Sequence, residues 1–120
     1  MMQDINDLTG KIIRAAYKVH SALGPGLLEN TYKECLYYEL VNADLDVEKE
    51  KTLPVIYESV KLDIGYRLDL FVESRVVVEI KSIEAFSDVY TAQVLTYLKL
   101  TQCKVGLLLN FNVPDLKKGN

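Results

Sequence analysis

The sequence predicts an α/β fold of the α+β kind, in which a mixed sheet of four or five strands is flanked by helices. Three observations support this prediction. Two stretches with helical periodicity occupy the first 42 residues. The middle of the chain is rich in Val, Ile, Leu, Tyr and Phe, interrupted by turn residues, and the last third is typical of a strand, a helix and a strand.

Two helices are predicted before residue 43. The first runs from about Thr9 to Leu23, where apolar residues recur at helical spacing, and Asp7 or Thr9 is expected to cap it. It ends at Gly24-Pro25-Gly26, because this tripeptide cannot continue a helix. The second helix is expected from about Leu27 to Asn42, with one apolar face.

The middle of the chain predicts three antiparallel strands. Alternating acidic and basic residues over 46–51 are typical of an edge strand, and Pro54 limits its hydrogen-bond ladder. Gly65 indicates a bulge or a close backbone approach. The expected extended segments are Asp46–Lys51, Val55–Tyr57, Val60–Ile64, Tyr66–Val72 and Val76–Lys81, with turns at Glu58-Ser59 and Glu73-Ser74-Arg75.

The register of the last two strands decides which side chains share a face. A three-residue loop sets Asp69 opposite Glu79, whereas a two-residue loop sets Asp69 opposite Ile80 and mixes the two faces. We expect the three-residue loop, because it leaves one face wholly apolar. That face holds Leu68, Leu70, Val72, Val76, Val78 and Ile80, and the other holds Arg67, Asp69, Phe71, Val77, Glu79 and Lys81.

Charged residues are unexpected in this hairpin, because strands are depleted in Asp, Glu and Lys. Asp69 and Glu79 would face each other about 5 Å apart at Cβ and repel, a cost that a bound divalent cation removes. Lys81 shares the face of Glu79. A half-exposed strand with solvated charges, in which Lys81 screens Glu79, explains any one of these residues alone. The functional interpretation therefore depends on residues elsewhere in the chain.

The last third predicts a crossover. Ser87 or Asp88 is expected to cap a helix that runs to about residue 101, and residues 104–110 predict a short buried strand. A strand, a helix and a strand with short connections form a right-handed parallel crossover.

Two helices carry further polar residues. Glu29 lies in the first turn of the second helix, where the helix dipole favours an acid, but it shares a face with Tyr32. Gln93 and Tyr97 share a face of the third helix, and an ordinary helical side-chain pair explains their spacing. A Gln among apolar neighbours nevertheless needs a hydrogen-bond partner. We expect Glu29, Gln93 and Tyr97 to border one cavity beside the carboxylates.

Composition limits the range of functions. The chain has 120 residues, 49% hydrophobic and 26% charged, which predicts one globular domain over 1–120. A homodimer or a protein partner would help to bury surface but is not required.

The formal net charge of -3 counts against a strong free-standing DNA binder. No stretch approaches the length of a membrane span and the N-terminus is acidic, so we expect a cytoplasmic protein. Cys35 and Cys103 are expected to be free thiols without a chemical role, and His20 a packing or helix-end residue.

A series of motifs occurs in order along the chain: Gly26-Leu-Leu-Glu29-Asn-Thr-Tyr32, then Asp69, then Glu79-Ile80-Lys81, then Gln93 followed by Tyr97. On these motifs the chain resembles the GxxExxY protein family, a branch of the PD-(D/E)XK nuclease superfamily. The resemblance covers about Leu8 to Pro114. It implies a restriction-endonuclease-like core, in agreement with the elements predicted above.

The resemblance also implies a divalent-metal site that takes Mg²⁺ or Mn²⁺. In that site Asp69 and Glu79 are the principal ligands, Glu29 assists from its helix, and the carbonyl of Ile80 completes the shell. Hard carboxylate oxygens suit these ions, which keep several waters and use few protein ligands.

The remaining motif residues match catalytic and supporting roles. Lys81 matches the residue that orients or deprotonates the attacking water, and a nearby cation would lower the pKa of its ammonium for that role. Gln93 and Tyr97 match a helix motif that supports the active site or touches the nucleic acid.

The leading hypothesis is a metal-dependent nuclease that hydrolyses phosphodiester bonds of DNA or RNA. The alternative is a nuclease-fold interaction module that binds a protein or nucleic-acid partner and hydrolyses nothing appreciable. Acidic net charge and small size favour the alternative, whereas the intact carboxylates and lysine oppose it. Divalent-cation binding discriminates between the two, because a scaffold has no need to hold two acids together.

Overall fold

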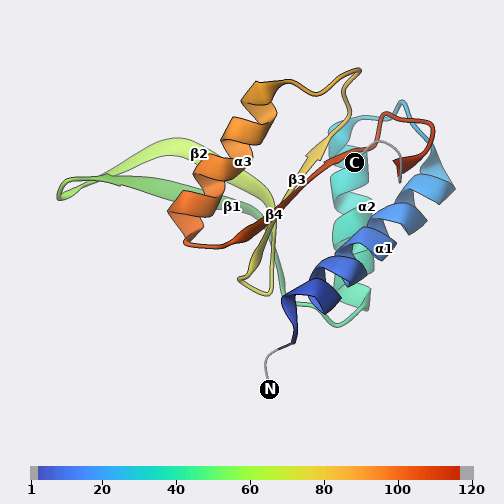
Figure 1. The fold of residues 1–120 in the computed structure, drawn as a ribbon, viewed down its shortest axis with the longest axis horizontal. Coiled ribbons are helices and arrows are strands. Elements are labelled where there is room, and N and C mark those ends of the chain that lie inside the picture. The colour runs from blue at the N-terminus through green and yellow to red at the C-terminus, as the bar shows by residue number, and fades with distance from the viewer. Residues whose placement is uncertain (1–2, 117–120) are drawn as a thin grey trace.

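The computed structural model of the chain describes residues 3–116, which form three helices and four strands (Figure 1). In chain order they are α1 (Ile5–Leu23), α2 (Glu29–Asn42), β1 (Val47–Tyr57), β2 (Val60–Val72), β3 (Val76–Lys81), α3 (Asp88–Thr101) and β4 (Val105–Asn110). None of the helices within residues 3–116 has both the length and the apolar character that crossing a lipid bilayer requires.

The four strands form one sheet in the order β1-β2-β3-β4. β2 pairs antiparallel with both β1 and β3, whereas β3 pairs parallel with β4 through the connection that contains α3. In Figure 1, α3 lies on one side of the sheet, and α1 and α2 lie on the other. The predicted mixed sheet flanked by helices is confirmed.

α1 begins earlier than predicted, at Ile5 instead of Thr9. The carboxylate of Asp4 accepts a hydrogen bond from the backbone N–H of Asn6 at 2.8 Å and thereby caps the helix. Asp7 and Thr9, the two predicted caps, both lie inside α1. Asp7 instead occupies the first turn, where its charge complements the helix dipole.

The other helix starts differ less from their predictions. α2 begins at Glu29 rather than Leu27, because the backbone of Leu28 is extended, with ψ of 146°. α3 is capped by Ser87, one of the two predicted residues, whose hydroxyl accepts from the backbone N–H of Val89 at 3.2 Å.

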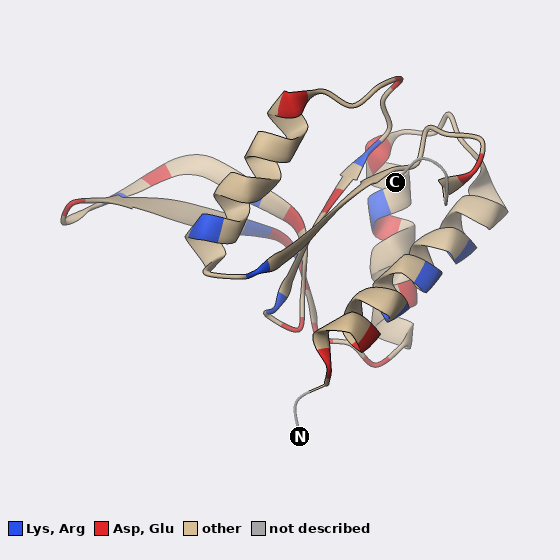
Figure 2. Cartoon of the chain, in the orientation of Figure 1, with Lys and Arg blue, Asp and Glu red and all other residues tan. Residues whose placement is uncertain are grey.

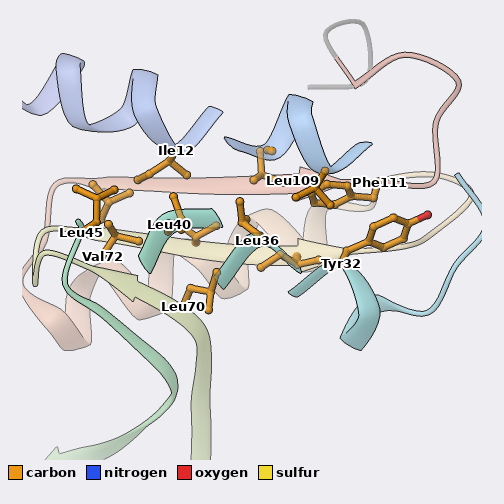
Figure 3. Close-up of a cluster of buried hydrophobic side chains, with 14 of the residues drawn as sticks. Ile12, Tyr32, Leu36, Leu40, Leu45, Leu70, Val72, Leu109 and Phe111 are labelled. Atoms are coloured by element: carbon orange, nitrogen blue, oxygen red, sulfur yellow. The ribbon is translucent and has the colours of Figure 1, made fainter. Parts of the chain in front are cut away.

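The main core lies between the sheet and the pair α1 and α2 (Figure 3). It includes Leu8, Ile12, Ala16 and Val19 of α1, Tyr32, Leu36 and Leu40 of α2, and Leu70, Val72, Val76, Val78 and Ile80 of the sheet. A smaller core on the α3 side contains Leu53, Leu68, Phe71, Val77 and Tyr97. The predicted apolar face is therefore confirmed except at Leu68, which faces the opposite side.

The change of face at Leu68 has a backbone cause in β1. Glu50 has φ of +56°, and its neighbours Lys49 and Lys51 pair with Leu70 and Leu68. The ammonium of Lys49 donates a hydrogen bond to Glu34 of α2, whereas that of Lys51 lies over the ring of Phe71 in the smaller core. A left-handed residue breaks the alternation of a strand, so the side chains before and after it face opposite sides.

The end of β1 over 55–57 and the beginning of β2 over 60–64 form an arm that projects away from α1 and α2 (Figure 1). The register shifts between Leu53 and Val55, and on the facing strand Gly65 has φ of +86°. The irregularity predicted at Gly65 therefore lies opposite the shift around Pro54. Both strands continue through it, so the predicted short segments on either side belong to single long strands.

Candidate functional site

The ladder between β2 and β3 changes character at Asp69 and Glu79. Paired residues extend from the turn only as far as Leu70 and Val78. Beyond them, the backbone N–H of Asp69 donates to Oε2 of Glu79 at 2.7 Å, and that of Ile80 donates to Oδ2 of Asp69 at 2.8 Å. Each acid thus accepts a backbone hydrogen bond from the opposite strand. The structure therefore brings the two predicted acids to the same junction between β2 and β3.

The environment of this pair disfavours negative charge. Glu79 is buried, with an exposed fraction of 3%, and Asp69 is half-buried. Burial, followed by the charge of Asp69, raises the pKa of Glu79 to about 7. Burial also raises the pKa of Asp69, although the hydrogen bond from Ile80 opposes that shift. A cation between the two acids would relieve both the burial cost and the repulsion.

Lys81 is the last residue of β3, two positions after Glu79. Its charge lowers the pKa of both Asp69 and Glu79, as a smaller influence than burial. The ammonium Nζ of Lys81 lies 5.0 Å from the centre of the Tyr90 ring in α3, a distance at which a cation and an aromatic face attract. The predicted lysine is therefore beside the carboxylates and held toward α3.

A cavity of about 280 Å³ opens beside Asp69. α2 contributes Glu29, Asn30 and Lys33 to its lining, and the sheet contributes Arg67, Asp69 and Ile80. Asn30, Lys33 and Arg67 are absent from the predicted site. Two signals in the sequence could have identified the cations: Arg67 precedes Asp69 by two strand positions, and Lys33 follows Glu29 by one helical turn.

Glu29 reaches this region from the first position of α2. Its Oε1 accepts a hydrogen bond from the backbone N–H of Ser82, immediately after β3, at 3.2 Å. The Ser82 hydroxyl in turn donates to the carbonyl of Leu27 at 2.7 Å. The charge of Glu29 contributes to the raised pKa of Asp69 and of Glu79. The beginning of α2 is therefore attached to the end of the strand that carries Glu79.

Tyr32 fixes the loop that precedes Glu29. Its hydroxyl donates to the carbonyl of Gly24 at 2.5 Å and accepts from the backbone N–H of Leu27 at 3.0 Å. The ring is fully buried and stacks on Phe111, with centroids 4.6 Å apart. Tyr32 consequently fixes the loop that leads into α2. It thereby also fixes the position of Glu29, which lies one helical turn before Tyr32.

Gln93 and Tyr97 approach the carboxylates from the other side of the sheet. Nε2 of Gln93 donates to the Tyr97 hydroxyl at 3.1 Å, which provides the partner that the sequence required. Burial raises the pKa of Tyr97, and the charges of Glu79 and Asp69 add to that shift. Neither residue lines the cavity beside Asp69. The expectation of one shared cavity was wrong, because α2 and α3 cover opposite faces of the sheet.

Lys33 has a structural partner in the strand irregularity. Its Nζ lies 2.5 Å from Oε1 of Glu50, and only 9% of the Lys33 residue is exposed. By contrast, the guanidinium of Arg67 forms no ion pair or hydrogen bond within residues 3–116, and Arg67 is exposed. Arg67 is therefore the cation of this cavity that remains available to a ligand.

The acidic side chains of the site match the needs of a small divalent cation. Within residues 3–116 no three acidic, His or Cys side chains are arranged to enclose an ion. Mg²⁺ and Mn²⁺ need no such cage, since they bind through one or two carboxylates and complete their shell with water and substrate oxygens. Asp69 and Glu79 fit that requirement, with Glu29 near enough to influence both electrostatically.

Comparison with known proteins gives one match. A family model described as the PD-(D/E)XK nuclease superfamily matches residues 6–120. Neither the curated proteins nor the solved structures contain a significant match to the chain. Nucleases of this superfamily act on nucleic acids and generally use divalent metal ions.

Proposed function

Because the chain belongs to the PD-(D/E)XK nuclease superfamily, we propose that it is a divalent-metal-dependent nuclease that hydrolyses phosphodiester bonds of DNA or RNA. The pairing of Asp69 with Glu79 carries this proposal. A buried acid next to a half-buried one, at the point where two strands separate, destabilises a protein unless a ligand compensates their charge. Lys81 beside them supplies the third residue of the superfamily's motif.

We further assign the chain to the GxxExxY branch. The motif residues Gly26, Glu29 and Tyr32 support this assignment, since each has a different role in the loop before α2 and the first turn of α2. Gly26 has φ of +96°, a conformation that favours glycine. Tyr32 anchors the loop, and Glu29 faces the carboxylate pair.

The ion of the proposed reaction is Mg²⁺ or Mn²⁺. The carboxylates of Asp69 and Glu79 would hold it, with the Ile80 carbonyl and Glu29 as additional oxygen donors. When bound, such an ion acidifies a coordinated water and neutralises charge on the phosphate under attack. The hydrogen bonds from the backbone of Asp69 and Ile80 keep both carboxylates oriented for that role.

Lys81 is the proposed residue that positions the attacking water. Its ammonium is one step along β3 from Ile80, and Tyr90 restricts it through the face of its ring. Positioned there, the ammonium of Lys81 would orient the water toward the phosphorus, or its neutral amine, once deprotonated, would accept the proton of the water. Gln93 and Tyr97 are the proposed support on the α3 side, since they are hydrogen-bonded to each other and the charges of Glu79 and Asp69 raise the pKa of Tyr97.

Arg67 and Asn30 are the proposed contacts to the substrate phosphate. Both are exposed and line the cavity next to Asp69. A guanidinium binds phosphate oxygens in two parallel hydrogen bonds, which fixes the orientation of the group. Lys33 is unsuited to this task, because Glu50 already pairs with it.

The alternative is a nuclease-fold interaction module, and one observation favours it. Both carboxylates already accept backbone hydrogen bonds, so the pair is held together without an ion. A module of this kind would bind nucleic acid or protein through the cavity and leave phosphodiester bonds intact.

The test is incubation with single- and double-stranded DNA and RNA in Mg²⁺ or Mn²⁺, together with calorimetric titration of Mn²⁺. We expect cleavage that Lys81→Ala abolishes, whereas Lys61→Ala, at an exposed lysine of the arm, leaves it unchanged. Asp69→Asn should lose both cleavage and Mn²⁺ affinity. Unchanged Mn²⁺ binding by Asp69→Asn would show that the acids are not a metal site, and the interaction module would then replace the nuclease.

A further inference from the structure

The outer face of α3 carries an ordered line of exposed residues. Asp88, Ala92, Leu95 and Lys99 follow one another at spacings of four, three and four residues, which places them along one side of a helix. All are exposed, and Leu95 is 54% exposed. In Figure 2, α3 is acidic at its beginning, basic near its end and uncharged between.

This line has a two-fold pattern. Asp88 and Lys99 are equidistant from the midpoint between residues 93 and 94, and so are Ala92 and Leu95. The flanking exposed threonines at 91 and 96 are equidistant from the same point. A helix with such a pattern is complementary to a second copy of itself that runs antiparallel, as an isologous contact requires.

We propose that the outer face of α3 binds the same face of a second copy of this chain, antiparallel and about a two-fold axis. Asp88 then lies opposite Lys99 of the second copy, and the small side chain of Ala92 receives Leu95. The arrangement is that of an antiparallel helix pair, in which a large side chain packs against a small one and opposite charges close the ends.

The helix dipole alone does not explain the pattern. An acid in the first turn and a base in the last turn both complement the dipole, which accounts for the two signs. It does not account for an uncharged, partly apolar line between them on the face that is turned away from the sheet. The inward face of α3 already has its partners, since Val94 and Tyr97 are buried.

The contact is small, so the association should be weak. α3 has 14 residues, and at 1.5 Å per residue it is about 21 Å long. A helix pair of that length buries less than the roughly 800 Å² per partner of a standard interface. We expect a dissociation constant on the order of 10–100 µM. The cavity beside Asp69 stays open in this dimer, because α2 and not α3 covers that side.

The test is sedimentation equilibrium over a range of concentrations that spans the expected constant. The wild type should pass from monomer to dimer. Asp88→Lys and Lys99→Glu should each remain monomeric, because each places like charges at both ends of the helix pair. An equimolar mixture of these two variants should dimerise again, because each lysine of one variant then faces an acid of the other.

Two further variants separate the proposed face from other surfaces. Leu95→Arg should abolish dimerisation, whereas Ile56→Arg, at a 62% exposed apolar residue of the arm, should leave it intact. Thermal melts verify that each variant is folded, and Leu95→Arg still tests the face if a charge reversal prevents folding. A wild type that stays monomeric, a mixture that does not associate, or loss of dimer only in Ile56→Arg overturns the proposal.

Discussion

The two ends of the pairing between β2 and β3 are built in opposite ways. Near the turn, three successive residue pairs form a regular ladder with buried apolar side chains, from Val72 and Val76 to Leu70 and Val78. One position further on, Asp69 and Glu79 are bonded through their side chains to the opposite backbone. The first end stabilises the fold through burial, and the second retains charge at a cost to stability. The residues that stabilise the fold therefore lie directly beside the residues of the candidate site on the same two strands.

The regular end should show the largest effect on stability. Leu70→Ala removes a fully buried side chain of the main core, so the free energy of unfolding should fall by about 2–5 kcal/mol. Urea denaturation in chelator measures this loss. The exposed control Ile56→Ala should change stability by less than about 0.5 kcal/mol. An equally small effect of Leu70→Ala would contradict the assignment of stability to this end.

The charged end should show an effect of opposite sign. Glu79→Gln removes an acid whose pKa is raised to about 7, so the metal-free variant should be more stable than the wild type at pH 8, by on the order of 3 kcal/mol. The wild type gains stability as the pH falls through 7 and Glu79 takes up a proton in the folded state. Below about pH 4.5 the acid is neutral in both states, and the two proteins should become equal.

Melts in chelator across this pH range measure the difference. Glu58→Gln, in the exposed turn of the arm, is the matched control and should follow the wild type. A Glu79→Gln variant that is less stable than the wild type at pH 8 would mean that the ionised acid supports the fold. The same variant should lose Mn²⁺ affinity, because an anionic ligand has gone.

The smallest effect is expected from Lys81→Ala. The loss of its contact with the Tyr90 ring should lower stability by about 0.5–1 kcal/mol. Mn²⁺ should bind at least as tightly, because a like charge has been removed. Calorimetric titration measures the affinity, with Lys61→Ala as control. A marked loss of Mn²⁺ binding would contradict the proposal that Lys81 lies outside the ligand shell of the ion.

Much of the fold was predictable from local patterns. The three-residue turn after Val72 follows from keeping one face apolar, and it is confirmed by the pairing of Val72 with Val76. The Ser87 cap and the parallel placement of β4 follow from capping chemistry and connection length. These features depend on neighbours in sequence, where periodicity and side-chain chemistry are informative.

The features that escaped prediction arise between distant segments. Leu68 faces the smaller core because Glu50, far away in sequence, adopts a left-handed conformation that glutamate rarely takes. Strict alternation placed Arg67 on the face of Asp69, Phe71 and Val77. In the structure Arg67 lines the cavity with Asn30 of α2, whereas Phe71 and Val77 belong to the smaller core on the α3 side. Alternation along a single strand contains no information about an irregularity in its partner. Which residues meet around Asp69 therefore required the three-dimensional structure.

The ion pair between Lys33 and Glu50 has a consequence for how this chain can vary. Replacing Glu50 alone would leave a nearly buried ammonium without its partner, and replacing Lys33 alone would remove the contact that holds a left-handed strand residue. Either change would act on the switch of face in β1 and β2, and so on the position of Arg67 in the cavity beside α2. The two positions should therefore be epistatic: a double substitution that replaces the ion pair by two compatible residues should cost less stability than the sum of the two single substitutions.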